Sequence, residues 1–270
     1  MDKRSIRFFA ILLCLVLSLS LCACGGSTYG VRELEVLVEQ EYSLAFRNDD
    51  STYNYVTAAI ETLNAEGTVG DLTGKWFGSS IIDFKKDAKA LEKVGMPEPR
   101  TFIIGVDINS FPMAYVVDGN YWGFDVQLAM AVCERLGWTL QIQPIEKENV
   151  YVELSSGNID CAWGGIALDP AEVEAGEYTQ YGPYVHNDIV IAARNGSSVW
   201  NKLRLGGRNM AMCSTPEAMA ALETDPKLKK RLGQITRLAG GTTECFEYLY
   251  AGKCDTVLTD STALYYFNCH

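Results

Sequence analysis

Two hydroxyl residues stand where a predicted strand gives way to a predicted helix late in the chain. Ser214 and Thr215 follow the apolar stretch 209–213 and precede Pro216 and Glu217, which open the helix. Hydroxyl and free N–H groups at the start of a helix suit an anionic group of a ligand. The same side chains would also make a good N-cap. A binding role and a purely structural role therefore both stay open.

A second candidate site follows an earlier strand. Asp107 ends the stretch TFIIGVD, and the loop that continues to Tyr115 carries Phe111. Phe111 and Tyr115 could stack on the aliphatic or planar part of a ligand, or they could simply pack the loop. Other aromatic candidates for the walls of a cleft are Trp122 and Trp163, although tryptophan more often belongs to a partly buried core.

Residues that catalysis or metal binding would need are scarce. The sequence has two histidines, no nucleophile elbow, and no Cys and His spacing typical of a zinc site. We therefore expect a protein that is not an enzyme and that holds no cofactor and no metal. The formal net charge of −11 argues against nucleic acid or an anionic membrane surface as a partner.

The amino terminus has the pattern of a secretion signal. Lys3, Arg4 and Arg7 precede the apolar run 8–21, which is too short for a spanning helix of about 20 residues. We assign residues 1–23 to a signal peptide and residues 24–30 to a flexible tether. The ending Leu-Cys-Ala-Cys resembles the bacterial lipobox, which implies a lipid on Cys24. An ordinary signal peptide or a short membrane anchor would equally place the rest outside the cytoplasm.

Six cysteines follow Cys24, and none forms a C-x-x-C pair. In an oxidising exterior an even number permits up to three disulfides, and the sequence does not choose the pairing. Four of the six lie between 213 and 269, where we expect at least one bridge. Buried free thiols are the alternative.

Periodicity divides the chain into elements that an α/β protein would need. A strand is expected at 41–46, helices at 51–64, 69–76 and 83–94, and a linker at 96–99. From residue 101 strands and helices alternate. Strands are expected at 101–107, 139–145, 159–163, 188–193, 209–213, 234–238 and 256–259, and helices at 125–136, 150–156, 216–223 and 244–250. Such alternation indicates parallel sheets with crossover helices, in two α/β units.

Several of these segments, taken in order, resemble the family 3 extracellular solute-binding proteins, the polar amino-acid receptors of ABC importers. The similar stretches are IGVDINSFPMAYV, GFDVQLAMAVCERLGW, LSSGNIDCAWGGIALDP, YGPYVHNDIVIAAR and EYLYAGKCDTVLTDSTALYYF. The resemblance implies an α/β, two-lobed periplasmic-binding-protein-like fold of type II with a hinge. It also implies a small polar solute, such as an amino acid or amine, an ABC importer permease as partner, and a monomer held by its lipid at the outer face of the cell membrane.

The order of segments departs from the family's. The stretch that begins EYSLAF looks like the family's carboxyl-terminal segment, yet here it stands first, so the chain is expected to be circularly permuted. A truncated or tandem gene product is the alternative. Lobe 1 is then expected at 41–193, including the permuted segment 41–78 and a linker 79–100. Lobe 2 is expected at 194–270 together with 31–40.

The resemblance also implies ligand contacts. It adds Ser110, the backbone at Gly164, Gly165 and Ile166, and Asp260 as the carboxylate that receives an α-ammonium. In the family an arginine at this position binds the α-carboxylate of the ligand. Here it is replaced by Glu172, which would repel a carboxylate. Either another cation takes its place, or the ligand is an amine or an uncharged polar solute. A purely structural alternative is that Glu172 caps a helix and faces solvent. The candidate cations are Arg47, Arg194 and Arg208.

Three functions follow from this reading. The first is a receptor that hands its solute to an importer. The second is a ligand-sensing domain of the same fold, and the third is a dehydratase-like enzyme, since dehydratases occur on this fold.

Overall fold

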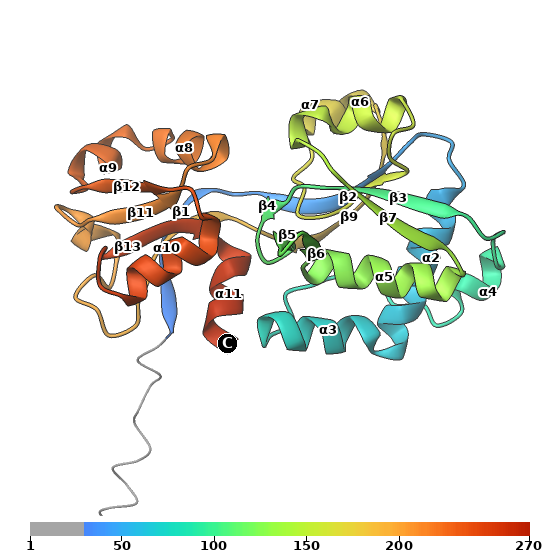
Figure 1. Cartoon of the computed structure of the whole chain (residues 1–270), viewed down its shortest axis with the longest axis horizontal. Coiled ribbons are helices and arrows are strands. Elements are labelled where there is room, and N and C mark those ends of the chain that lie inside the picture. The colour runs from blue at the N-terminus through green and yellow to red at the C-terminus, as the bar shows by residue number, and fades with distance from the viewer. Residues whose placement is uncertain (1–29) are drawn as a thin grey trace, which may run out of the picture.

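The computed structural model describes residues 30–270, so the predicted signal peptide, Cys24 and nearly all of the tether lie outside the described residues. Residues 30–270 form two α/β lobes joined by extended chain (Figure 1). None of the helices in this range is long and apolar enough to cross a membrane.

The first lobe is built on a five-stranded sheet in the order β7-β3-β8-β2-β9. Its strands are β2 (Glu41–Phe46), β3 (Thr101–Val106), β7 (Thr139–Pro144), β8 (Cys161–Ala162) and β9 (Thr179–His186). Strand β3 runs parallel to β7 and β8, whereas β2 runs antiparallel to β8 and β9. The helices of this lobe are α2 (Thr52–Glu66), α3 (Thr68–Phe77), α4 (Ala90–Val94), α5 (Phe124–Leu136), η1 (Lys147–Asn149), α6 (Val150–Ser155) and α7 (Pro170–Ala175).

The second lobe is built on a five-stranded sheet in the order β1-β10-β13-β11-β12. Its strands are β1 (Val31–Val38), β10 (Ile189–Arg194), β11 (Met210–Cys213), β12 (Ile235–Leu238) and β13 (Thr256–Asp260). Strand β11 pairs in parallel with β12 and β13, and β10 pairs antiparallel with β1 and β13. The helices here are η2 (Lys202–Leu205), α8 (Pro216–Glu223), α9 (Pro226–Arg231), α10 (Gly241–Tyr250) and α11 (Ser261–Cys269).

The chain crosses between the lobes twice, at 39–40 and at 187–188. The two crossings are bonded to each other, because the N–H of Asn187 donates to the carbonyl of Gln40 at 2.9 Å. Strand β10 follows the second crossing and belongs to the sheet of lobe 2. The prediction from the sequence that lobe 1 extends to residue 193 is therefore wrong. The error arose because a buried apolar strand has the same sequence pattern in either sheet. Only its pairing with β1 and β13 shows to which lobe β10 belongs.

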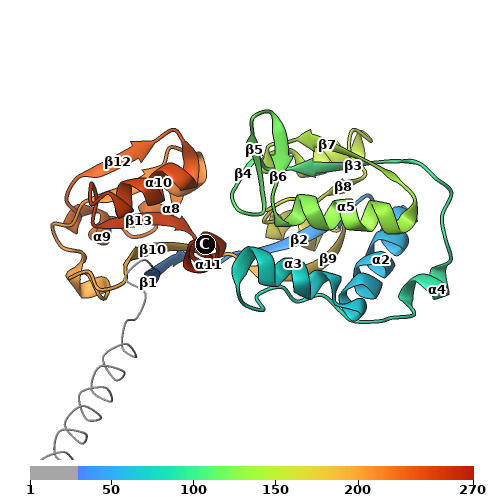
Figure 2. The same cartoon turned by 60° about the horizontal axis from the view of Figure 1, so that its bottom comes forward.

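Aromatic side chains link the lobes beside the crossings. Helix α11 of the second lobe lies against α3 of the first (Figure 2), with the rings of Tyr266 and Trp76 5.9 Å apart. Phe111, from the first lobe, packs into the second lobe's core, 4.8 Å from Tyr266. These contacts join the two lobes on one side of the groove between them.

Many element positions were predicted correctly, but lobe 1 shows three clear errors. A helix was predicted at 83–94, but only Ala90–Val94 is helical. Tertiary hydrogen bonds hold the first half of that stretch extended: the N–H of Asp83 donates to the carbonyl of Tyr184, and the Asn64 amide donates to the carbonyl of Phe84.

Two further parts of lobe 1 contain strands that were not predicted. Strand β9 has no counterpart among the predicted strands. The loop predicted after residue 107 contains a small sheet of β4 (Asn109–Ser110), β5 (Ala114–Val117) and β6 (Asn120–Trp122).

The cysteine prediction does not hold. All six cysteines within the described residues are free thiols. The sulfur atoms of Cys213 and Cys245 are 3.8 Å apart, which is contact rather than a bond. No disulfide is therefore formed within the segment 213–269, where at least one was expected. The alternative of free thiols is observed, and four of the six are buried.

Candidate functional site: a cleft between the lobes

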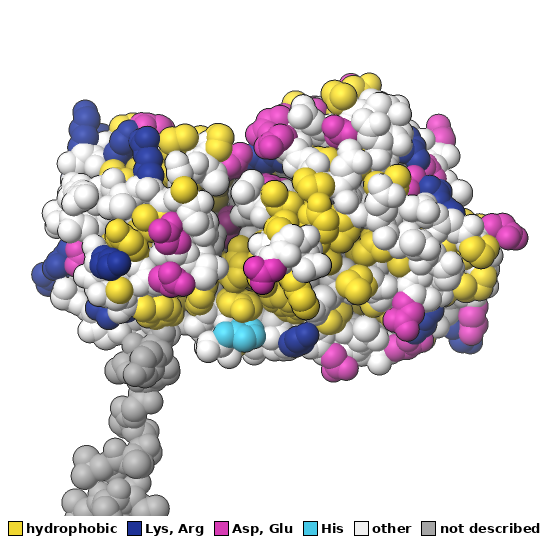
Figure 3. Space-filling view, viewed as in Figure 1, with side chains coloured by type: hydrophobic (Ala, Val, Ile, Leu, Met, Phe, Trp, Pro, Cys, Tyr) yellow, Lys and Arg dark blue, Asp and Glu magenta, His cyan; other side chains and the backbone are white. Residues whose placement is uncertain are grey.

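A cleft of about 630 Å³, its open mouth included, lies between the two lobes. Figure 3 shows the groove, with acidic side chains in and beside it. Residues after the carboxyl ends of β3, β11 and β13 line the cleft, which is where open α/β sheets bind ligands. The lining residues are Gln40, Tyr42, Asp107, Asn109, Ser110, Lys147, Gly165, Ala167, Ile189, Cys213, Thr215, Glu217, Ala218, Thr242, Leu258, Thr259 and Asp260.

The wall formed by lobe 1 is held from behind by a fully buried carboxylate. Asp125, in the first turn of α5, accepts hydrogen bonds from the N–H of Gly165 (2.9 Å), the hydroxyl of Tyr184 (2.6 Å) and the indole of Trp163 (3.3 Å). Burial raises the pKa of Asp125 to about 7, although the three donors pull it down. The turn 163–165 is therefore fixed by groups that face away from the cleft.

Gly165 must be glycine for this wall to form. Its φ is +66°, and a Cβ there would lie 2.2 Å from the Cβ of Ser110. The Ser110 hydroxyl instead donates to the Gly165 carbonyl at 2.8 Å. The close approach joins the loop after β3 to the turn after β8.

The wall formed by lobe 2 carries Asp260, the last residue of β13. It occupies the N-cap position of α11, yet its side chain makes no capping hydrogen bond. Its Oδ1 accepts from the amide of Asn187 at 2.9 Å. Burial, together with the charges of Asp107 and Glu217, raises the pKa of Asp260 to about 6, although the Asn187 hydrogen bond and Lys147 pull it down. The carboxylate is thus aimed at the cleft rather than used by the helix that it precedes.

Asn187 orients Asp260 from the crossing between the lobes. It is fully buried, and its Nδ2 also donates to the hydroxyl of Tyr42 in lobe 1 at 2.5 Å. Its Oδ1 accepts from the backbone N–H and the hydroxyl of Thr262 at 3.1 and 2.5 Å. One side chain therefore ties the first lobe, the ligand-facing carboxylate and the start of α11 together.

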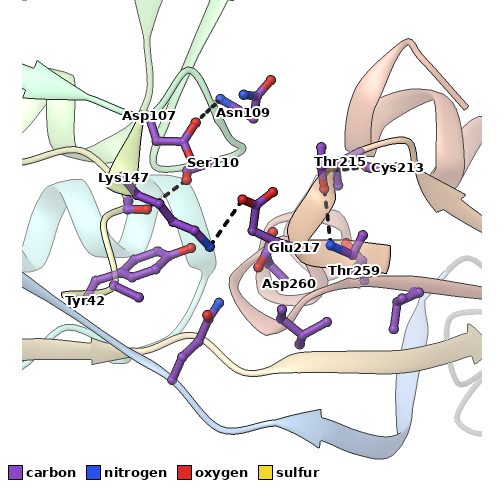
Figure 4. Close-up of a pocket in the computed structure, with 17 residues that line it drawn as sticks. Tyr42, Asp107, Asn109, Ser110, Lys147, Cys213, Thr215, Glu217, Thr259 and Asp260 are labelled. Atoms are coloured by element: carbon purple, nitrogen blue, oxygen red, sulfur yellow. Dashed lines mark hydrogen bonds and ion pairs between the residues drawn. The ribbon is translucent and has the colours of Figure 1, made fainter. Parts of the chain in front are cut away.

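Charged groups from both lobes meet across the cleft. Lys147 follows β7 in lobe 1, and its Nζ lies 3.4 Å from a carboxylate oxygen of Glu217 at the start of α8 in lobe 2 (Figure 4). Asp107 lies beside them and accepts from the N–H of Asn109 at 2.9 Å. Burial and the charge of Glu217 raise the pKa of Asp107. Among the described residues that line the cleft, Lys147 is the only lysine or arginine.

Two threonines of lobe 2 differ in how their hydroxyls are used. Thr215 caps α8, because its Oγ1 accepts from the N–H of Ala218 at 3.3 Å. Thr259 lines the cleft with 5% of its surface exposed, and its Oγ1 has no hydrogen-bond partner within the described residues. Thr259 is paired opposite Val190, so its buried hydroxyl lies on the face of β13 opposite to the Asp260 side chain.

The structure gathers some of the predicted site residues and separates others. Asp107, Ser110, Gly165, Thr215 and Asp260 all line the cleft. Three more predicted residues, Phe111, Tyr115 and Ser214, line a neighbouring depression instead. Fully buried behind the wall are Trp163 and Ile166, and Gly164 is buried there too. Glu172 lies in the first turn of α7 and does not line the cleft.

None of the three arginines considered as replacement cations reaches the cleft. Arg47 pairs with Asp50 and Asp160 inside lobe 1. Arg208 lies 3.5 Å from Asp255 on lobe 2, and Arg194 ends β10. Sequence reasoning missed Tyr42, Lys147, Glu217 and Thr259. The position of Lys147 after the strand 139–144 could have suggested it, since the carboxyl ends of parallel neighbours share an edge.

Comparison with known proteins identifies the family. The family described as bacterial extracellular solute-binding proteins, family 3, matches residues 102–237, half of the chain. The chain belongs to this family. Its fold is the two-lobed periplasmic-binding-protein fold, and the family binds solutes rather than catalysing reactions. The importer-receptor resemblance inferred from the motifs is thereby confirmed at the level of the family.

Individual relatives are distant. The Bacillus subtilis "Probable amino-acid-binding protein YxeM" is 24% identical over 161 residues, 60% of each chain. The same organism's "Arginine-binding extracellular protein ArtP" is 21% identical over 42% of this chain and 44% of its own. The chain thus spans three fifths of the first relative's length and less than half of the second's.

Solved structures of similar proteins include a polar amino acid ABC uptake transporter substrate binding protein from Streptococcus thermophilus. It is 26% identical, with a TM-score of 0.46 over 59% of this chain and 61% of that one. A Streptococcus pneumoniae substrate binding protein with bound histidine is 26% identical, with a TM-score of 0.45 over 60% and 66% of the two chains.

Proposed function

We propose that this chain is an extracytoplasmic solute-binding protein that encloses a small polar, amino-acid-like ligand and delivers it to an ABC importer permease. The observation that carries the proposal is Asp260, a carboxylate at the end of a strand that faces a cleft between two lobes and caps nothing. An ammonium group of a ligand bound there would make a charge-assisted contact. The names of the two Bacillus subtilis relatives, both amino-acid-binding, agree with this ligand class.

The proposed mechanism is closure of the lobes over the ligand. The two crossings at 39–40 and 187–188 form the hinge, and Lys147 and Glu217 approach each other from opposite lobes. Closure about such a hinge buries the ligand and presents a surface built from both lobes to a partner. In this proposal the protein acts as a monomer, with lobe 1 at 41–187 and lobe 2 at 188–270 plus 31–40.

The lipid anchor is a separate part of the proposal. The ending Leu21-Cys22-Ala23-Cys24 supports attachment at Cys24. Cells that express the full chain should incorporate labelled fatty acid into the protein and hold it in the membrane fraction. Cys24→Ala should abolish labelling and release the protein. Labelling that persists in Cys24→Ala would contradict an anchor at this residue.

The order of the segments supports a circular permutation. Residues 31–46 come first in the chain, yet they supply one strand to each sheet, β1 at the edge of one and β2 inside the other. The amide of Asn268 donates to the carbonyl of Val31 at 3.0 Å and accepts from its N–H at 2.8 Å. A chain running from α11 into β1 would therefore follow the order that the resemblance implies, with a connection across a short gap.

The binding proposal is tested by thermal unfolding of the purified protein against a panel of amino acids, amines, small peptides and sugars. Ligand at about 100 times its Kd adds about 2.7 kcal/mol to the free energy of unfolding, so Tm rises by several degrees. The rise should disappear in Asp260→Ala and persist in Asp71→Ala, an exposed aspartate on α3. A folded protein that responds to no member of the panel would overturn the proposal.

A further inference from the structure

The charges that line the cleft do not balance. Three carboxylates, those of Asp107, Glu217 and Asp260, face one cation, Lys147. The pKa of Asp260 is raised by burial and by the charges of Asp107 and Glu217, although Asn187 and Lys147 lower it. Lys147 is itself paired with Glu217 at 3.4 Å. The cleft as formed therefore carries two more negative charges than positive ones.

The cleft also offers no place for a ligand carboxylate. The start of α8 could have held one, but Thr215 uses its hydroxyl to cap the helix and Glu217 puts a carboxylate in the first turn. The position where the family resemblance implies an arginine is Glu172, which lies outside the cleft lining. A carboxylate brought by a ligand would meet Lys147 only by competing with Glu217.

A second observation marks where a ligand cation would bind. Asp260 lines the cleft, and only its Oδ1 accepts a hydrogen bond from the described residues. A ligand N–H that reaches its second carboxylate oxygen gains a charge-assisted bond without displacing one. This open oxygen suits an ammonium or guanidinium group.

We propose that the ligand is a small organic dication without a carboxylate, a diamine or a decarboxylated basic amino acid. One cationic group binds at Asp260 of lobe 2, and the second lies beside Asp107 of lobe 1. Two ligand charges then compensate the two excess carboxylates, and the ligand itself bridges the lobes. This inference rests on the proposed solute-binding function and names its substrate class.

Matched pairs of compounds test the proposal because their members differ only in the carboxylate. Calorimetric titration of the purified protein compares lysine with cadaverine and arginine with agmatine at pH 7.5 and low salt. We expect the decarboxylated member of at least one pair to bind at least about tenfold more tightly, as roughly 1.4 kcal/mol of carboxylate repulsion would give. Equal binding, or tighter binding of the amino acid, would overturn the inference and leave the solute-binding function intact.

A variant of Glu217 sharpens the test. Glu217→Gln removes one excess charge and frees Lys147, so the preference for cadaverine over lysine should shrink by about tenfold or reverse. Glu223→Gln is the matched control, because Glu223 is on the same helix but exposed and paired with Lys229. That variant should keep the wild-type preference. An unchanged preference in Glu217→Gln would contradict the charge argument.

The remaining outcomes separate the two proposals. Tight binding of a neutral amino acid such as glutamine, with none of cadaverine or agmatine, would overturn the dication and support the amino-acid-like ligand. No binding of any compound by a protein shown to be folded would overturn both proposals.

Discussion

Two aspartates, the fully buried Asp125 of lobe 1 and the half-buried Asp260 of lobe 2, show how the two walls of the cleft differ. Asp125 has three donors on its carboxylate, from Gly165, Trp163 and Tyr184. Asp260 has one, from Asn187. Loss of solvent raises the pKa of both, to about 7 and about 6. The same chemical group is therefore saturated with donors in one wall and left open in the other.

The difference assigns the two residues different tasks. A saturated carboxylate can fix the turn behind the cleft but has little capacity left for a ligand. An open carboxylate on a cleft surface costs stability in the empty protein and regains it when a cation binds. Substitution should therefore act mainly on folding at Asp125 and mainly on binding at Asp260.

The largest expected effect is on folding. Asp125→Ala leaves two N–H groups and a hydroxyl without their partner in the lobe 1 core, and we expect the free energy of unfolding to fall by about 3–5 kcal/mol. Chemical denaturation at pH 7 measures it. Asp71→Ala, on the exposed face of α3, should stay within about 0.5 kcal/mol of the wild type. A loss below about 1 kcal/mol in Asp125→Ala would remove the contrast between the two aspartates.

The next effect is on binding. Asp260→Asn keeps an oxygen that can accept from Asn187 but removes the charge, so affinity for cadaverine should fall about 100-fold, or about 2.7 kcal/mol. Calorimetry measures the affinity, and the unfolding free energy of the empty protein should change little. Binding that survives Asp260→Asn with less than a threefold change would show that the open carboxylate has another purpose.

Sequence patterns predicted most of the fold because its elements are locally coded. The strand 41–46 and the helix 216–223 have the predicted bounds in the structure. The assignment of β10 to a lobe and the true length of α4 were missed. Both depend on partners far away in the chain, which periodicity does not contain.

The site was predicted only in part, for a related reason. Asp107 was predicted because it ends a strand, and Asp260 was predicted from the family resemblance. Three other residues line the cleft only because the two lobes face each other in the folded protein, namely Lys147, Glu217 and Tyr42. Phe111 has the type and the place of a ligand contact, yet it packs into the core of the opposite lobe. The position of a residue along the chain predicts whether it lies at the edge of a sheet. It does not predict whether its side chain points into the cleft or packs into a core.

A smaller effect concerns pH. The pKa of Asp260 is raised to about 6, so its carboxyl group is ionised above pH 6 and loses its negative charge as the pH falls below that value. Cadaverine stays a dication throughout, so its Kd should rise about tenfold between pH 7 and pH 5. Asp107, Glu217 and Lys147 face the same space, and the raised pKa of Asp107 would steepen the loss in the same direction.

The control for this pH effect is Asp260→Asn, in which most of the dependence should disappear. A flat profile in the wild type would mean that binding does not need the ionised carboxylate. The comparison with Asp125 would then rest on folding alone.

The smallest effect compares two threonines on the same strand, β13. Thr256 Oγ1 donates to the carbonyl of Asn209 at 3.3 Å, whereas Thr259 Oγ1 has no partner within the described residues. Thr256→Val should therefore lower the free energy of unfolding by about 1 kcal/mol, and Thr259→Val should leave it unchanged or raise it slightly. Cadaverine affinity should stay within about twofold of the wild type in both variants, because Thr256 does not line the cleft and Thr259 lies on the face of β13 opposite to Asp260. A loss of stability in Thr259→Val equal to that in Thr256→Val would mean that the Thr259 hydroxyl contributes a hydrogen bond to the fold, and the openness of the lobe 2 wall would then be limited to Asp260.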